Sequence, residues 1–90
     1  MLYLVIERFK NGNPRPVYDR FDAHGRLAPD GVQYVNSWVT SDLTTCYQVM
    51  QTDDRALLDQ WIANWSDIVD FDVHEVMTSS EARAKAVGQR

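Results

Sequence analysis

Two strands joined by a turn are predicted between Val32 and Thr52, where the sequence reads VQYVNSWVTSDLTTCYQVMQT. The segments Val32–Val39 and Thr45–Gln51 are rich in Val, Tyr, Trp and Thr, which suit a pleated sheet. The residues between them, Thr40–Thr44, are mostly short and polar, as is typical of turns. We therefore expect this stretch to form a β-hairpin.

Side chains along a strand alternate between two faces, and the two predicted faces of this hairpin differ in character. One face is apolar enough to lie beneath helices, and it carries Val35, Ser37, Val39, Tyr47 and Val49. The other face carries Tyr34, Asn36, Trp38, Cys46, Gln48 and Met50. Aromatic rings beside amides and a thiol favour a lined pocket or a subunit interface on this second face. A wet interface without any ligand is the alternative.

The segments before the hairpin predict one strand and one helix. Leu2–Phe9 is mostly apolar on both faces, so we expect a central strand that is covered on both sides. Pro14 suits the first turn of a helix, in which Val17 and Phe21 begin an apolar stripe. Gly25 either allows this helix to pack closely on the sheet or ends it.

The segments after the hairpin predict a second helix and a last strand. Thr52 or Asp53 can cap this helix, and apolar residues recur at helical spacing over 57–65. Val69–Thr78 alternates apolar and polar residues and is expected to be the last strand.

The resulting element order, β-α-β-β-α-β, is typical of a ferredoxin-like α+β sandwich. We expect residues 1–78 to form this single domain and residues 79–90 to form a short C-terminal helix or a frayed tail. The four-stranded antiparallel sheet would carry both helices on one face. Its uncovered face would expose Tyr3, Val5, Phe9, Tyr34, Trp38 and Met50. An apolar patch of this size is unusual on a monomer, so a homodimer through the sheet face is predicted.

The composition argues against several classes of function. The 90-residue chain has 9 Lys and Arg against 13 Asp and Glu, and the basic residues are scattered, so nucleic-acid binding is not expected. One Cys and two His without close spacing make no recognisable zinc site, and neither a metal nor a cofactor is expected. The lone Cys and the shortness of every apolar run predict a cytoplasmic protein with no membrane partner.

Six short segments, spread over the chain up to about Thr78, carry a family resemblance. They are Val5–Phe9, Gly25–Arg26, Tyr34–Val35, Ser37–Val39, Cys46–Met50 and Asn64–Asp67. These segments resemble a family of short bacterial proteins known only as a domain of unknown function. The element order is also similar to the dimeric α/β-barrel superfamily, which includes cofactor-independent monooxygenases, muconolactone-type isomerases and haem-handling enzymes. No catalytic motif of that superfamily can be placed on this chain residue by residue.

A cavity on the uncovered face is the predicted site. It would be lined by Glu7, Tyr34, Asn36, Trp38, Cys46, Gln48 and His74. Glu7 on a buried strand needs a partner or a raised pKa, unless it lies near the strand end or pairs with an Arg. Arg20, His24 and Arg26 could meet a ligand carboxylate, although a solvated helix face is the favoured interpretation.

Three hypotheses of function follow from these features. In the first, a homodimer encloses a pocket that binds a small organic molecule. In the second, the pocket belongs to a cofactor-independent enzyme of the isomerase or monooxygenase type, with Glu7 or His74 as the general base. In the third, the dimer is purely structural. Whether the protein is an enzyme stays open on sequence alone.

Overall fold

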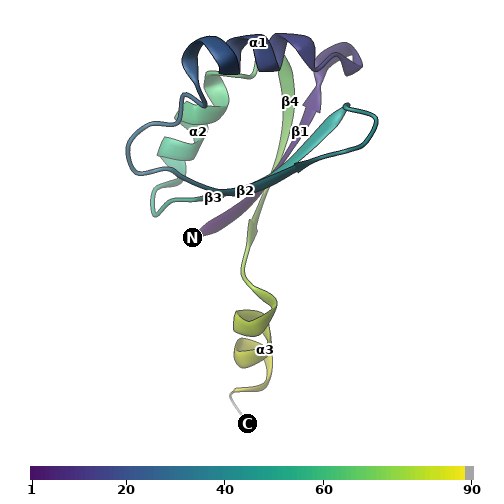
Figure 1. Ribbon diagram of the computed structural model, residues 1–90. Helices are drawn as coiled ribbons and strands as arrows, with labels where there is room; N and C mark the ends of the chain where they lie inside the picture. The colour runs from purple at the N-terminus through teal and green to yellow at the C-terminus, as the bar shows by residue number, and fades with distance from the viewer. Residues whose placement is uncertain (89–90) are drawn as a thin grey trace.

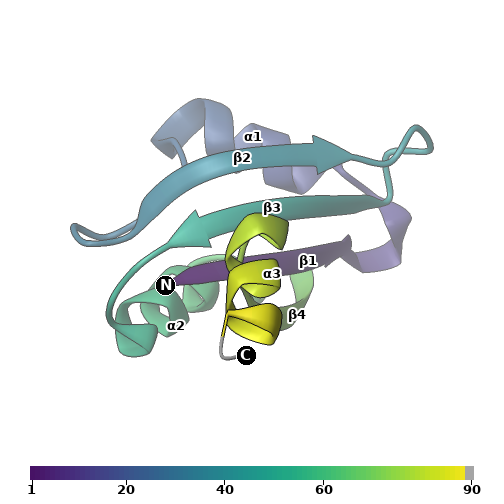
Figure 2. The ribbon, with the colours of Figure 1, turned by 90° about the horizontal axis from the view of Figure 1, so that it is seen from below.

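The computed structural model describes residues 1–88 and contains a four-stranded antiparallel sheet with two helices against one face (Figure 1). The elements are β1 (Leu2–Phe9), the 3-10 helix η1 (Lys10–Gly12), α1 (Arg15–His24), β2 (Gln33–Val39), β3 (Thr45–Gln51), α2 (Arg55–Ala63), β4 (Val69–Val76) and α3 (Ser79–Val87). The strands lie in the order β2-β3-β1-β4. Figure 2 looks onto the face without α1 and α2 and shows β2, β3 and β1 side by side. The predicted ferredoxin-like α+β fold is confirmed.

The local signals in the sequence explain most element boundaries. The hairpin of β2 and β3 forms as predicted, and α1 ends at Gly25, whose φ of 73° is easily adopted only without a side chain. The cap of α2 differs from the prediction. Asp54, rather than Thr52 or Asp53, accepts a hydrogen bond from the Ala56 backbone N–H at 2.9 Å. Thr52 is buried at the end of β3, where its hydroxyl accepts from the Asp54 backbone N–H at 3.1 Å.

The C-terminal segment extends away from the sheet (Figure 1). The predicted short helix is present as α3, and residues 89–90 of the segment lie outside the described residues. Thr78 caps α3, because its hydroxyl accepts from the Glu81 backbone N–H at 3.1 Å. The longest helix within residues 1–88 is α1, with 10 residues, and none of the described helices is long and apolar enough to cross a membrane.

The predicted faces of β1 and β3 are wrong. Tyr3, Val5, Glu7 and Phe9 of β1 are buried on the side that the helices cover. The β1–β3 register places Met50, Gln48 and Cys46 of β3 directly opposite the first three of these residues, on the same side. The uncovered face instead carries Leu2, Leu4, Ile6, Tyr47 and Val49. Because β1 is apolar on both faces, its hydrophobic pattern could not determine which face meets the helices.

A β-bulge in β2 changes the phase of that strand. Tyr34 pairs with Met50 but Asn36 pairs with Val49, so Val35 is an extra residue in β2. Tyr34 therefore lies on the helix-covered side, whereas Trp38, at a position of the same parity, lies on the uncovered side. Ser37 and Val39 also lie on the helix-covered side, as predicted, because they pair with Gln48 and Cys46.

The hydrophobic core lies mainly between the sheet and α2. Trp61 and Leu58 of α2 are fully buried against Val5 and Met50, and Trp65 follows them into the core. The apolar residues predicted at helical spacing over 57–65 thus provide much of the core. By contrast, α1 contributes no buried residue. Packing between α1 and the sheet is therefore incomplete.

Candidate functional site

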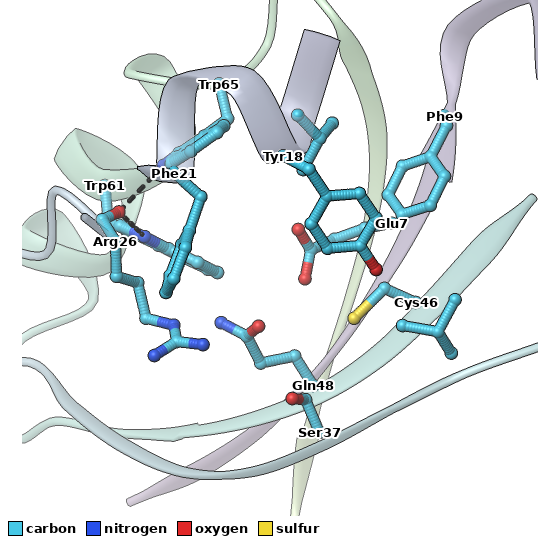
Figure 3. Close-up of a pocket in the computed structure, with 12 residues that line it drawn as sticks. Glu7, Phe9, Tyr18, Phe21, Arg26, Ser37, Cys46, Gln48, Trp61 and Trp65 are labelled. Atoms are coloured by element: carbon cyan, nitrogen blue, oxygen red, sulfur yellow. Dashed lines mark hydrogen bonds between the residues drawn. The ribbon is translucent and has the colours of Figure 1, made fainter. Parts of the chain in front are cut away.

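A cavity of about 260 Å³ lies between α1 and the helix-covered side of the sheet (Figure 3). The strands contribute Glu7 and Phe9 (β1), Ser37 and Val39 (β2), and Cys46 and Gln48 (β3). The helical side contributes Val17, Tyr18 and Phe21 of α1, Arg26 of the loop after α1, Trp61 of α2, and Trp65. Most of these side chains are aromatic or aliphatic, and a few polar groups lie among them. This composition is typical of sites that bind small organic molecules.

Glu7 provides the buried carboxyl group of the cavity. Its side chain is only 7% exposed, and its Oε2 atom has no hydrogen-bond partner within the described part of the chain. Burial raises the pKa of Glu7 to about 7, although the Cys46 thiol and the charge of Arg26 act in the opposite direction. Near neutral pH this carboxyl group is therefore partly protonated, and one of its oxygens is free to meet a ligand.

Cys46 lies directly opposite Glu7 in the β1–β3 register. Burial raises the pKa of its thiol to about 12, and the charge and hydrogen bonding of Glu7 act in the same direction. The thiolate is the nucleophilic form of cysteine, and it is scarcely populated at such a pKa. Cys46 is therefore a hydrogen-bonding neighbour of Glu7 rather than a nucleophile.

Arg26 lies in the loop that follows α1, at the edge of the cavity (Figure 3). Its guanidinium carbon lies 3.7 Å from the centre of the Tyr34 ring and 5.2 Å from that of Phe21, distances that allow cation–π contact with both rings. Its backbone carbonyl accepts hydrogen bonds from the indole N–H groups of Trp61 at 3.0 Å and Trp65 at 2.9 Å. The loop and the two tryptophans are thus fixed relative to one another.

Gln48 is the third polar group of the wall. It is 4% exposed, and its Nε2 atom donates a weak hydrogen bond to the Met50 sulfur at 3.2 Å. In Figure 3 its amide lies between the side chains of Arg26 and Glu7. The cavity wall therefore presents the Arg26 cation, the Gln48 amide and the Glu7 carboxyl group in this order.

The structure brings three of the predicted site residues together, namely Glu7, Cys46 and Gln48. Tyr34 lies beside them through its contact with Arg26, and its hydroxyl shares a 2.7 Å hydrogen bond with Ser37. These residues meet on the helix-covered side of the sheet. The predicted position of the pocket, on the uncovered face, is wrong, since the phase of β1 and β3 is the reverse of the predicted one.

The other three predicted residues lie on the opposite face. Asn36 and Trp38 follow the bulge in β2 and point away from the helices, and Trp38 is 57% exposed. His74 pairs with Leu4 in the β1–β4 register, and its Nε2 lies 3.3 Å from an Asp72 carboxylate oxygen. The sheet therefore separates His74 from Glu7, and the two cannot act on one ligand.

Sequence reasoning underestimated Arg26 and did not connect the aromatic residues of α1 and α2 with a cavity. Of the three cations considered for a ligand carboxylate, Arg20 makes two hydrogen bonds with Asp67, at 2.8 and 2.7 Å, and His24 is exposed at the end of α1. Only Arg26 lines the cavity. The signal that could have indicated it is Gly25, which ends the helix and turns the next residue inward.

Within residues 1–88, no group of three or more His, Cys, Asp or Glu side chains is placed to hold a metal ion. Comparison with curated proteins and with solved structures gives no significant match. A family described as a domain of unknown function, DUF3303, matches residues 1–89. The chain therefore belongs to this family, in agreement with the resemblance predicted from its sequence segments.

Proposed function

We propose that the protein binds a small organic molecule in the cavity between α1 and the sheet. The observation that carries this proposal is the buried Oε2 atom of Glu7, which has no partner within residues 1–88 and lies at the wall of a cavity. A buried polar atom without a partner costs about 1–3 kcal/mol. A ligand that hydrogen-bonds to Glu7 would remove this penalty.

The size of the cavity restricts the ligand. Its volume of about 260 Å³ is slightly below the roughly 300–1,000 Å³ of typical ligand pockets. An engineered apolar cavity of about 150 Å³ holds one benzene molecule, so this cavity has room for a single ring with small substituents. The aromatic walls, provided by Phe9, Tyr18, Phe21 and Trp61, favour a flat molecule.

An enzyme that transfers protons is the second candidate. A general base works best when its pKa is near the working pH, and the pKa of Glu7 is about 7. Of the two predicted bases, His74 lies on the other side of the sheet, so only Glu7 remains. Proton abstraction by Glu7 is the step that cofactor-independent isomerases and monooxygenases would share.

A panel of single-ring compounds tests the binding proposal, with phenol, benzyl alcohol, benzamide and benzoate as the probes. In two-dimensional NMR spectra, we expect at least one probe to shift the indole N–H signals of Trp61 and Trp65 and the side-chain amide of Gln48. The indole signal of Trp38, on the opposite face, serves as the internal control and should not move. If no probe shifts the cavity signals at millimolar concentration, the proposal is wrong.

We also propose that the uncovered sheet face pairs with a second copy of the chain. Ile6, Tyr47 and Trp38 form a row across β1, β3 and β2, since Tyr47 pairs with both of the others. Trp38 is 57% exposed and Tyr47 is 40% exposed. The row crosses three of the four strands, and a two-fold axis through it would place each row against its equivalent. Within residues 1–88, α1 and α2 both lie on the opposite face, and α3 extends away from the sheet (Figure 1).

Light scattering after size exclusion tests this pairing. The wild-type protein should have twice the mass of one chain at micromolar concentration, and Trp38→Asp should convert it to a folded monomer. Trp38→Phe keeps an aromatic ring and should leave the dimer intact. A monomeric wild-type protein would contradict the proposal, whereas a dimer that binds none of the probes would favour a purely structural role.

A further inference from the structure

We infer that the ligand of the proposed cavity is a flat organic acid, whose carboxylate binds to Arg26 and whose opposite end hydrogen-bonds to Glu7. This inference rests on the proposed binding function and adds the chemical class of the ligand. It is carried by a cation without an ionic partner at the edge of the cavity, and by a buried carboxyl oxygen without a partner farther inside.

Arg26 has the free hydrogen-bonding capacity that a carboxylate needs. No ion pair within residues 1–88 involves its guanidinium group. The contacts that it does make are with aromatic rings, at 3.7 Å from Tyr34 and 5.2 Å from Phe21. Stacking of this kind uses the flat faces of the guanidinium and leaves its N–H groups, which lie in the plane, for an acceptor. Carboxylates match this planar fork with two parallel hydrogen bonds.

The loop that carries Arg26 is held in place before any ligand binds. Two indole N–H groups, from Trp61 and Trp65, donate to the Arg26 carbonyl. The next carbonyl, that of Leu27, accepts from the Asn64 side-chain amide at 3.0 Å. A ligand therefore does not need to order this backbone when it binds, which reduces the entropic cost of binding.

The charge of the whole chain makes this cation more significant. The protein has a formal net charge of −4, so its overall field repels anions. An anionic ligand would be attracted only by a local cation, and Arg26 is the one basic side chain among the residues that line the cavity. The proposed carboxylate contact is therefore expected to depend on this residue.

Glu7 determines what the other end of the ligand can be. A second carboxylate there would be repelled whenever Glu7 is ionised. A hydroxyl group can donate to the ionised carboxyl group or accept from the protonated one, so it suits both states. Gln48, whose amide lies between Arg26 and Glu7 in Figure 3, can bond to either end. The preferred ligands are therefore hydroxy-substituted ring carboxylic acids.

Three matched probes test the inference by isothermal titration calorimetry. They are 4-hydroxybenzoate, the neutral 4-hydroxybenzamide, and benzoate, which lacks the hydroxyl group. We expect the wild-type protein to bind 4-hydroxybenzoate about tenfold or more tightly than the amide, since hydrogen bonds to charged groups are the stronger class. It should also bind 4-hydroxybenzoate more tightly than benzoate.

Two variants assign these preferences to residues. Arg26→Gln should abolish the preference for the acid over the amide, whereas Arg83→Gln, which removes an exposed cation on α3, should leave it unchanged. Thermal melting of Arg26→Gln, whose backbone contacts to Trp61 and Trp65 do not need the side chain, checks that the variant is folded. Equal binding of acid and amide by the wild-type protein, or an unchanged preference in Arg26→Gln, would overturn the inference and leave the proposed pocket standing. Failure of all three probes and of the neutral single-ring compounds would overturn both.

Discussion

Replacing Glu7 by Gln should remove most of the pH dependence of stability that this buried carboxyl group imposes. The pKa of Glu7 is raised by burial from 4.5 to about 7 in the folded protein, whereas an unfolded chain leaves it near 4.5. Between these two values the unfolded state releases the proton and the folded state keeps it. The free energy of unfolding therefore falls as the pH rises through this range.

The structure gives the size of the effect. Each pH unit between the two pKa values corresponds to about 1.4 kcal/mol, so the wild-type protein should lose up to roughly 3 kcal/mol between pH 4.5 and pH 7. Below pH 4.5 both states are protonated and the loss vanishes, and above pH 7 it is constant. The total free energy of unfolding of a small domain is about 5–15 kcal/mol, so a change of this size is large enough to measure. In Glu7→Gln this component should be absent.

Urea denaturation followed by tryptophan fluorescence, repeated from below pH 4.5 to above pH 7, measures this difference. Glu75→Gln is the matched control, because Glu75 is exposed on β4 and its replacement should leave the pH dependence as in the wild type. A carbon-13 NMR titration of the Glu7 carboxyl group gives its pKa directly. Titration near 4.5, or equal pH dependence in Glu7→Gln and the wild type, would refute the reasoning.

Three further predictions concern packing and reactivity around the cavity and the loop that precedes β2. Gly31→Ala should lower the free energy of unfolding by about 1–3 kcal/mol in urea denaturation, because Gly31 has a φ of +93° and a Cβ atom there would lie 2.9 Å from Leu57 Cδ1. Cys46, whose pKa is raised to about 12, should resist iodoacetamide at pH 8 in the native protein and react in urea, as mass spectrometry can report. Gln48→Met should raise the free energy of unfolding by about 1 kcal/mol, since Gln48 gives up only a weak bond to Met50, and should weaken 4-hydroxybenzoate binding.

Element positions could be predicted from local signals in the sequence. The bounds of β1 and β3 agree with the predicted strands, and β2 begins one residue later than predicted. These signals, the alternation of apolar residues and the turn residues between them, act over a few neighbouring positions, so one sequence is enough to detect them. The element order then leads to the ferredoxin-like fold.

The faces of the sheet could not be predicted in the same way. In β1 the residues of one face (Leu2, Leu4 and Ile6) are about as apolar as those of the other (Tyr3, Val5 and Phe9). The two-residue alternation therefore does not indicate which face meets the helices. In β2 the extra residue Val35 reverses the phase between Tyr34 and Asn36, and no residue type in the sequence marks the bulge. Both features depend on contacts between strands, which a single strand does not encode.

Two polar residues whose face was predicted wrongly, Glu7 and Gln48, both line the cavity. Glu7 and Gln48 were predicted to line a cavity on the uncovered face, with Glu7 in phase with Tyr3 and Val5 along β1. They lie on the helix-covered side because α1 stands above them without burying a residue, and the space left between is the cavity. Apolar side chains at both positions would satisfy the fold without an unpartnered buried oxygen, so packing does not explain the residues present. Places where local pattern and burial disagree are expected to be functional sites, and Glu7 and Gln48, two of the three buried polar residues within residues 1–88, line one cavity.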